Sequence, residues 1–210
     1  MHITGIVEND YTQKTVETMK YLLRAENKKM SVIEYGNRFK NRKIWRDYWD
    51  ALAQIETEIL LVRIKATDFE GAFQALHFDT LIVSDYAQWK IISSKIRKIS
   101  KNSMNQMILI LNSDLIKPSN FSDEEKYRLL CYGFNSDSNV TTSSTGEPSF
   151  SGKYLCCIRK GIVSANVKAV EPQEFVVDLE NMEDDPYSIL AAASFAVLHG
   201  VDLNKVNERQ

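Results

Sequence analysis

Apolar residues in the first half of the chain alternate between short continuous runs and stretches with helical spacing. Runs such as EILLVRI and QMILIL are typical of buried strands, whereas TVETMKYLLRA carries apolar residues three and four positions apart. The pattern predicts strands at residues 1–6, 30–35, 58–64, 80–83 and 106–111, and helices at 15–25, 45–55, 69–76 and 88–99. Strands separated by single helices pair in parallel through right-handed crossovers. We therefore expect an α/β fold, a mostly parallel open sheet flanked by helices.

The pattern changes after Pro118, where short β-rich segments are separated by turn residues. These segments lie at residues 129–134, 154–159, 162–167 and 174–178. The Ser/Thr/Asn-rich run at 136–145 has the composition of a loop. The second half is therefore expected to add a small β-rich region to the parallel sheet.

A final helix is expected at residues 186–199, which are Ala-rich and apolar around most of the circumference. Either Asp184 or Asp185 is suited to cap its start, with Pro186 in the first helical position. We expect one domain over residues 1–210. Its parts are a parallel α/β part (1–117), a β-rich part (118–180) and a helix that closes on the sheet (184–202).

Composition narrows the function classes. The net charge of −2 and the isoelectric point near 6.0 do not indicate binding to nucleic acid or to an anionic membrane. No apolar stretch is long enough to span a bilayer, and the first residues do not read as a signal peptide. Cys131, Cys156 and Cys157 are an odd number, two of them adjacent, which favours a reducing compartment. We expect a cytoplasmic protein.

One basic run, RFKNRKIWR at residues 38–46, holds five Lys or Arg residues with Phe39 and Trp45 among them. It is either a solvated surface segment or a contact for nucleic acid, in which aromatic rings stack beside cations. The overall charge favours the solvated segment, so no nucleic-acid partner is expected.

A candidate phosphate-binding segment follows the first predicted strand. Gly5 ends an apolar run, and Lys14 and Thr15 open an amphipathic helix, the order found in nucleotide-binding loops. The second glycine of such a loop is missing, and the charges of Glu8 and Asp10 would oppose a polyphosphate. The segment is therefore either an altered nucleotide site or an ordinary strand–loop–helix crossover.

Oxygen donors follow two of the later strands. Asp85 comes after the strand at 80–83, and Asn112 and Asp114 come at the end of the strand at 106–111. Open α/β sheets bind ligands at the carboxyl ends of their strands, so these three residues are candidates for nucleotide or magnesium contact. The alternative is that they cap helices or turns.

The chain as a whole resembles the central domain of the Mur ligases and folylpolyglutamate synthases, which use ATP to join a carboxylate to an amine. The resemblance is carried, in the order found in the family, by ITG at residues 3–5 with KT at 14–15, FDTLIVSD at 78–85, LILNSD at 109–114, CYGFNSDSNV at 131–140 and PYSILAAASFAVLHGVD at 186–202. It implies ATP and magnesium as cofactors. The cofactor-binding residues that it implies are Gly5, Lys14, Thr15, Asp85, Asn112 and Asp114.

The positions that carry the chemistry in these enzymes differ in this sequence. Arg63 aligns with the family's magnesium-binding glutamate, and Trp89 and Lys90 align with its Asp-His pair. None of the three is a usual magnesium ligand. No counterpart is found for the lysine that the peptidoglycan ligases carbamylate, so we assign no catalytic residue and no metal ligand.

Two hypotheses follow. The first is a catalytically degenerate domain, a pseudoenzyme that binds a protein partner or a small-molecule ligand in the ancestral cleft. The second is the ATP-binding component of an ATP-dependent carboxylate–amine ligase, of the peptidoglycan (cell-wall) or folylpolyglutamate type, completed by another chain. The loop at residues 6–13 separates them. Convergent N–H groups beside Lys14 would favour the second hypothesis, and Glu8 or Asp10 in that space would favour the first.

Overall fold

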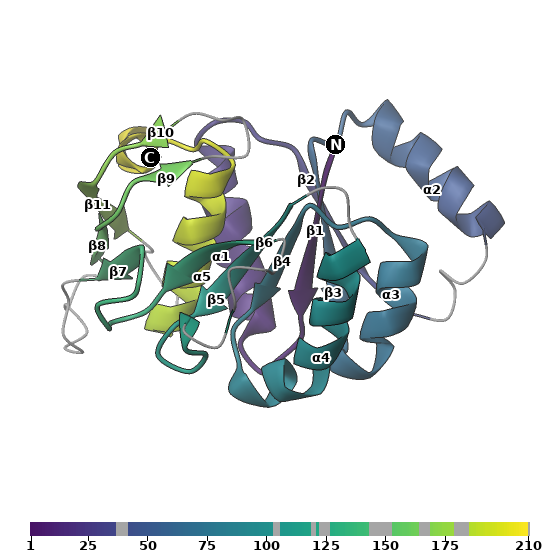
Figure 1. The fold of residues 1–210 in the computed structure, drawn as a ribbon. Coiled ribbons are helices and arrows are strands. Elements are labelled where there is room, and N and C mark those ends of the chain that lie inside the picture. The colour runs from purple at the N-terminus through teal and green to yellow at the C-terminus, as the bar shows by residue number, and fades with distance from the viewer. Residues whose placement is uncertain are drawn as a thin grey trace.

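A nine-stranded sheet covered by helices on both faces forms the framework of the molecule (Figure 1). The computed structural model describes residues 1–36, 42–102, 106–118, 121, 127–142, 153–163, 169–178 and 185–209. The strands are β1 (His2–Val7), β2 (Met30–Glu34), β3 (Ile59–Ile64), β4 (Thr80–Val83), β5 (Met107–Asn112), β6 (Tyr127–Tyr132), β7 (Val140–Thr142), β8 (Lys153–Ile158), β9 (Ile162–Val163), β10 (Ala169–Val170) and β11 (Gln173–Asp178). The α-helices are α1 (Thr12–Arg24), α2 (Arg42–Gln54), α3 (Phe69–Ala75), α4 (Tyr86–Asn102) and α5 (Pro186–Leu198), and the 3-10 helices are η2 (Ala66–Asp68) and η4 (Leu203–Arg209).

The strands follow the order β11-β8-β7-β6-β5-β4-β1-β3-β2. All neighbours from β2 to β7 pair in parallel, and the antiparallel pairs β7–β8 and β8–β11 extend the same sheet. Strands β9 and β10 form a separate antiparallel pair. The expected α/β fold with a mostly parallel open sheet is confirmed, and the β-rich second half continues that sheet.

One local prediction was wrong. The run at 136–145 has the composition of a loop, but β7 lies within it, and Thr141 and Thr142 pair with Cys157 and Cys156 of β8. The strand is only three residues long and two of them are threonines, so its sequence carries no apolar run. Residues 143–145 lie outside the described part of the chain, as do 164–167 of another predicted strand and Asp184.

Two hydrophobic clusters occupy the two faces of the sheet. The first packs α1 and α5, which lie side by side, against one face (Figure 1). The second packs α2, α3 and α4 against the other face. Strand β3 serves both clusters, since Leu61 belongs to the first and Leu60 and Val62 to the second. This two-sided burial explains the continuous apolar runs in the sequence.

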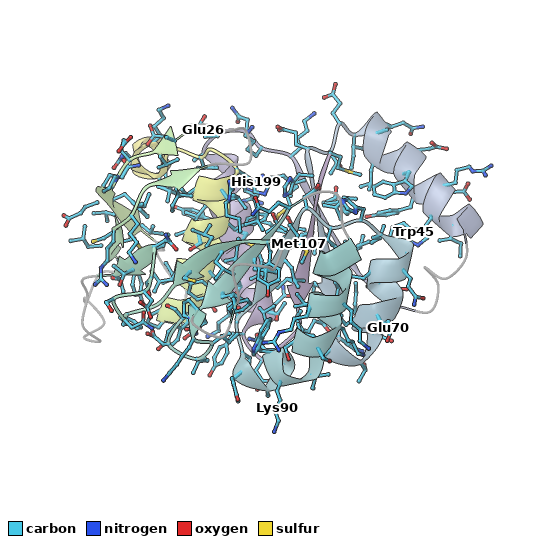
Figure 2. The ribbon with its side chains drawn as sticks, in the orientation of Figure 1. Glu26, Trp45, Glu70, Lys90, Met107 and His199 are labelled. Carbon is cyan, nitrogen blue, oxygen red and sulfur yellow. The ribbon has the colours of Figure 1, made fainter. Side chains whose placement is uncertain are left out.

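Helix α5 is buried over nearly its whole length, from Ser188 to Leu198. Its alanines allow the close approach to α1 and the sheet that a helix between two layers requires, and the side chains fill this region densely (Figure 2). Of the two cap candidates from the sequence, Asp185 caps the helix, and Pro186 takes the first position as predicted. It runs from the carboxyl end of the sheet to the amino end, where His199 follows it.

The start of α1 differs from the sequence prediction. The strand β1 continues to Val7 and α1 begins at Thr12 rather than at residue 15, so residues 8–11 alone connect the two elements. The basic run also differs, because Arg42 already belongs to α2, whereas residues 38–41 lie outside the described part. No helix in the part of the chain that the structure describes is long and apolar enough to cross a membrane.

Candidate functional site

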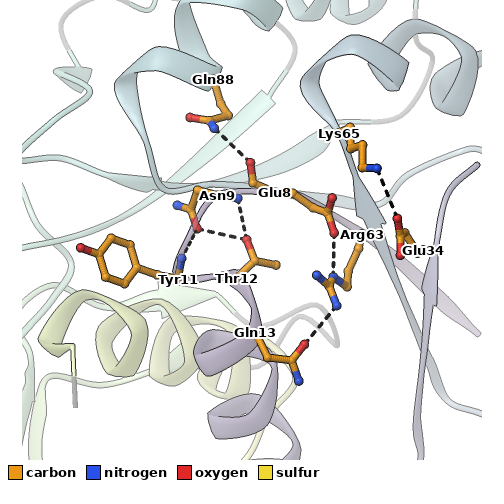
Figure 3. Close-up of polar contacts among 9 residues, drawn as sticks. All are labelled: Glu8, Asn9, Tyr11, Thr12, Gln13, Glu34, Arg63, Lys65 and Gln88. Atoms are coloured by element: carbon orange, nitrogen blue, oxygen red, sulfur yellow. Dashed lines mark hydrogen bonds and ion pairs between the residues drawn. The ribbon is translucent and has the colours of Figure 1, made fainter. Parts of the chain in front are cut away.

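The connection between β1 and α1 uses its own backbone donors (Figure 3). The Glu8 N–H donates to the carbonyl oxygen of Ile64 at 2.9 Å. The Asn9 N–H donates to Thr12 Oγ1 at 2.8 Å, and the Tyr11 N–H donates to Asn9 Oδ1 at 3.0 Å. A phosphate-binding loop turns such N–H groups toward its ligand. Here three of these donors are occupied by the protein itself.

The side chain of Asn9 holds this connection in place. Its Oδ1 accepts the Tyr11 N–H and also the Thr12 hydroxyl, each at 3.0 Å. The Thr12 N–H in turn donates to the Asn9 carbonyl oxygen at 3.2 Å. The amide oxygen of Asn9 therefore takes the hydrogen bonds that a bound anion would otherwise receive from this segment.

Arg63 ties the same connection to the sheet. Its Nε lies 2.9 Å from Oε1 of Glu8, and its Nη1 donates to Gln13 Oε1 at 3.0 Å (Figure 3). Gln88 of α4 donates from Nε2 to the Glu8 carbonyl oxygen at 3.0 Å. The side chains of Arg63 and Glu8 are 28% and 15% exposed, so the ion pair is only partly exposed to water. The connection is thus fixed to β3 and α4.

Gly5 lies inside β1 rather than in the connection, between Val62 of β3 and Leu81 of β4. A Cβ at this position would come within 3.0 Å of side-chain atoms of Ile64 and Leu81 and within 3.2 Å of Phe78. The glycine allows these side chains to pack against the strand. The structure gives it this packing role, and it does not line the cavity that contains Thr15.

Lys14 and Thr15 are neighbours on α1 but have different surroundings. Lys14 is exposed, whereas Thr15 is buried and its Oγ1 donates to the Tyr11 carbonyl oxygen at 3.1 Å. Thr15 lines a cavity and Lys14 does not. The hydroxyl predicted to serve magnesium is therefore engaged by the backbone of its own helix.

A cavity of ≈ 240 Å³ lies at the carboxyl ends of β4 and β5, beside the starts of α1 and α5. Three predicted site residues meet there, Thr15, Asp85 and Asn112, as the rule for open α/β sheets predicts. The lining also includes residues that sequence reasoning did not assign to the site, namely Asn9, Tyr11, Ser84, Leu115, Asp185, Tyr187 and Ser188. Asp114 does not line it.

Two carboxylates line this cavity, and each also caps a helix. Asp85 Oδ1 accepts the Ala87 N–H at 2.5 Å at the start of α4. Asp185 Oδ2 accepts both the N–H and the hydroxyl of Ser188, each at 2.9 Å, at the start of α5. Both arrangements are N-caps, in which a carboxylate satisfies donors of the first helical turn. Asp85 therefore both caps α4, which the sequence left open as an alternative, and lines the cavity.

Asp114 is engaged in the turn after β6. Its Oδ2 accepts the Phe134 N–H at 2.7 Å, and its Oδ1 accepts the Asn135 N–H at 3.0 Å. Gly133, with φ of 148°, passes so close that a Cβ there would lie 2.7 Å from Asp114 Oδ2. Burial, followed by the charge and hydrogen bonding of Asp114, raises the pKa of the Tyr187 hydroxyl. Asp114 is thus a turn residue in this structure.

Tyr132, which is fully buried, lies behind the cavity wall. It pairs on β6 with Asn112 of β5, a lining residue that is 1% exposed. The Tyr132 hydroxyl forms no well-aligned hydrogen bond with any described residue. Burial raises its pKa well above the usual range, with Ser84 opposing this effect and Asp185 adding to it. Ser84, which interacts with this hydroxyl, lines the cavity, whereas Tyr132 itself does not.

The residues present do not fit a magnesium nucleotide. None of the described residues that line the cavity is Lys or Arg, and two are Asp. No group of three or more His, Cys, Asp or Glu among the described residues is arranged to hold a metal ion. The residues that the sequence resemblance aligns with the family's magnesium ligands are the ion-paired Arg63, the buried Trp89 and the exposed Lys90. A polyphosphate would meet carboxylates without the dication that normally offsets them.

The main feature that sequence reasoning missed is the closure of the connection by Asn9. Its signal is the pattern Asn-x-x-Thr at residues 9–12, in which two short polar side chains can exchange bonds with the backbone. Tyr11 and Tyr187 had no such signal, because their meeting at one cavity depends on how the ends of α1 and α5 are placed.

Comparison with known proteins shows which solved structures have a similar fold. No protein-family model and no curated protein sequence matches the chain. Among solved structures, MurF ligase from Thermotoga maritima in complex with ADP matches 98% of this chain with a TM-score of 0.55 and 17% identity. The chain has a Mur-ligase-like fold. A bifunctional folylpolyglutamate synthase/dihydrofolate synthase from Yersinia pestis, complexed with AMPPNP and Mn, matches 98% of it with a TM-score of 0.58 and 10% identity.

These likenesses support the central domain of the Mur ligases and folylpolyglutamate synthases as the related fold, as the sequence resemblance implies. A murein peptide ligase from Psychrobacter arcticus also matches 98% of the chain, with a TM-score of 0.55 and 11% identity. The chain spans 47% of the MurF ligase, 45% of the murein peptide ligase and 55% of the Yersinia enzyme. At these identities the agreement concerns the fold, and function has to be argued from the site.

Proposed function

We propose that this protein is a Mur-ligase-like binding module that does not form amide bonds. It holds a small-molecule ligand or a protein partner at the carboxyl end of its sheet. The observation that carries the proposal is the closed connection at residues 8–11, where the N–H groups of Glu8, Asn9 and Tyr11 bond to Ile64, Thr12 and Asn9. These three N–H groups are therefore not available to wrap a polyphosphate.

The charge around the connection supports the same proposal. By the sequence resemblance, Arg63 aligns with the carboxylate that the related enzymes use for magnesium, and its guanidinium is paired with Glu8. An intramolecular cation and anion therefore occupy the region between β3 and α1.

We also place the protein in the cytoplasm, because the number of cysteines is odd and Cys156 and Cys157 are adjacent.

The alternative function is the ATP-binding component of a carboxylate–amine ligase of the peptidoglycan or folylpolyglutamate type, completed by another chain. One observation favours it. Lys14 lies on the first turn of α1, where the helix dipole is positive, and Thr15 lines the adjacent cavity. ATP and magnesium would then be the cofactors, as ADP or AMPPNP and Mn are present in the similar structures.

Isothermal titration with Mg-ATP and Mg-AMPPNP separates the two functions. For the binding module we expect no nucleotide binding with a Kd below about 1 mM, which corresponds to roughly −4 kcal/mol. The variant Lys14→Ala should behave like the unaltered protein. Micromolar binding that is abolished in Lys14→Ala, but retained in the matched control Lys20→Ala on an exposed position of the same helix, would contradict the proposal.

A further inference from the structure

The two outer strands of the nine-stranded sheet differ in what lies beside them. Helix η4 packs against β11 at one end of the strand order, and Asn204 of η4 donates from Nδ2 to Gln173 Oε1 of β11 at 3.2 Å. At the other end, β2 pairs with β3 alone among the described residues. Its sequence, MSVIE, contains no proline and no lysine, and its five residues pair with β3 without a bulge. An edge strand of this kind is open to a further strand.

Alternate residues of β2 direct their backbone groups away from the sheet. The Tyr35 N–H donates to the Arg63 carbonyl oxygen at 2.8 Å, and the Lys29 carbonyl oxygen accepts the Ile59 N–H at 3.1 Å. These directions alternate from one residue to the next along a strand, so residues 29, 31, 33 and 35 face β3. The N–H and C=O groups of residues 30, 32 and 34 therefore point outward, and no described residue forms a hydrogen bond with them.

The side chains make this edge complementary to a second copy of itself. If two β2 strands pair antiparallel with Ser31 opposite the partner's Ser31, Met30 lies opposite the partner's Val32. Both residues are half-buried on the face that packs against α1 and α5, so the pairing adds apolar cross-strand contacts. In the same register Lys28 lies opposite the partner's Glu34. Because the pair has two-fold symmetry, each of these contacts occurs twice.

The charges beside β2 support this register. Lys28 Nζ lies 3.2 Å from Oε2 of Glu58, and Lys65 Nζ lies 3.6 Å from Oε1 of Glu34. Across the pair the order becomes Glu58, Lys28, the partner's Glu34 and the partner's Lys65, a row that alternates in sign. Centring the pair on Val32 instead would put Glu34 opposite the apolar Met30 of the partner. Centring it on Met30 would put two carboxylates, Glu34 and the partner's Glu26, opposite each other.

We propose that this chain forms a two-fold symmetric dimer in which the β2 strands of two copies pair antiparallel about Ser31. The two sheets then join into one continuous sheet across the symmetry axis. Since the paired strands run in opposite directions, the carboxyl ends of the two sheets point opposite ways, and each copy keeps its own cavity. This surface is separate from the cavity, so the proposal goes beyond the binding function and does not depend on it.

Sedimentation velocity over a range of protein concentrations tests the proposal. We expect a species of twice the 24.1 kDa chain mass, with a dissociation constant of about 1–100 µM because the paired strands are short. Val32→Pro removes an outward N–H group but none of those that bond to β3, so the chain should fold while its dimer dissociation constant rises about tenfold or more. A protein that stays monomeric at about 100 µM overturns the inference and leaves the edge to an extended segment of another protein.

Charge reversal followed by mixing tests the register, and it decides the question even if Val32→Pro does not fold. In a dimer of Lys28→Glu two glutamates face each other, and in a dimer of Glu34→Lys two lysines do, so each variant alone should dimerise about tenfold more weakly. An equal mixture of the two variants should recover the unaltered affinity, because each pair again holds one lysine and one glutamate. Lys20→Glu, at an exposed position on α1, should dimerise like the unaltered protein. A dimer that is unchanged in Val32→Pro or in both charge variants, or a mixture that stays monomeric, overturns the β2 pairing.

Discussion

The two ends of the parallel sheet treat polar side chains in different ways. At the carboxyl end, Asp85, Asp114 and Asp185 accept backbone N–H groups from helix starts and turns. At the amino end, His2 and His199 pack edge to face with ring centroids 4.6 Å apart, and burial lowers the pKa of both. In Figure 2, His199 lies on the amino-end side of the molecule, above Lys90 at the carboxyl end.

The difference assigns separate tasks to the two ends. Carboxylates that accept backbone N–H groups fix the helix starts and the turn at the carboxyl end. Imidazoles buried against each other and against Phe195 give the amino end a cluster in which burial disfavours the protonated form of both rings, although Asp79 opposes this effect at His2. We therefore expect ligand binding to depend on the first end and acid sensitivity of the fold to depend on the second.

The largest expected effect is the acid sensitivity that His199 confers. Burial, followed by the charges of His2 and Lys28, lowers the pKa of His199 from 6.5 to about 3. The unfolded chain therefore binds the proton first, and stability that is fully present above pH 6.5 is lost as the pH falls from 6.5 toward 3. At about 1.4 kcal/mol per pH unit, this amounts to roughly 2 kcal/mol between pH 7 and pH 5.

Urea unfolding of His199→Leu at these two pH values measures the contribution. The leucine keeps an apolar contact with Phe195 but cannot titrate, so the loss of stability between pH 7 and pH 5 should shrink by roughly 2 kcal/mol. His77→Gln, at an exposed histidine, serves as the control and should keep the full loss. If His199→Leu and the unaltered protein lose the same stability, the acid sensitivity does not arise at this residue.

An effect of similar or smaller size is expected at the carboxyl end when Asp114 is replaced. Asp114→Ala leaves the N–H groups of Phe134 and Asn135 without their acceptor, and we expect a loss of about 1–3 kcal/mol in the free energy of unfolding. Asp114→Asn keeps one carbonyl acceptor and should lose less. The loss should be similar at pH 7 and at pH 6, in contrast to the histidine effect. Equal stability of Asp114→Ala and the unaltered protein would show that the turn after β6 does not depend on this carboxylate.

The sequence predicts the helices and strands because their patterns depend on residues that are close together in the chain. Strands such as β3 and β5 are buried on both faces, so they appear as continuous apolar runs, and α5 carries its own cap in Asp185 and Pro186. The meeting of Asp85 and Asn112 at one cavity also follows from sequence, since parallel strands end at the same edge of a sheet.

The contacts that fix the connection at residues 8–11 are not predictable from the sequence in the same way. Glu8 and Arg63 lie far apart in the chain, and their pairing depends on β1 and β3 being adjacent in the sheet with Ile6 opposite Arg63. The meeting of His2 and His199 likewise requires the two ends of the described chain to converge through α5. Gly5 and Lys14 keep the order of a nucleotide site. However, β1 continues to Val7 and α1 begins at Thr12, so only residues 8–11 remain as a connection between the two elements.

The smallest expected effect is the coupling between Glu8 and Arg63, measured by a double-mutant cycle of Glu8→Gln and Arg63→Met. The ion pair is partly exposed, so we expect a coupling energy of about 0.5–1 kcal/mol that falls in 1 M NaCl. Methionine keeps the aliphatic packing of the arginine stem, which isolates the charge. A coupling energy of zero would show that the connection at residues 8–11 is held by its hydrogen bonds alone. In either case Arg63→Met should not gain nucleotide binding, because the oxygen of Asn9 still accepts the Tyr11 N–H and the Thr12 hydroxyl.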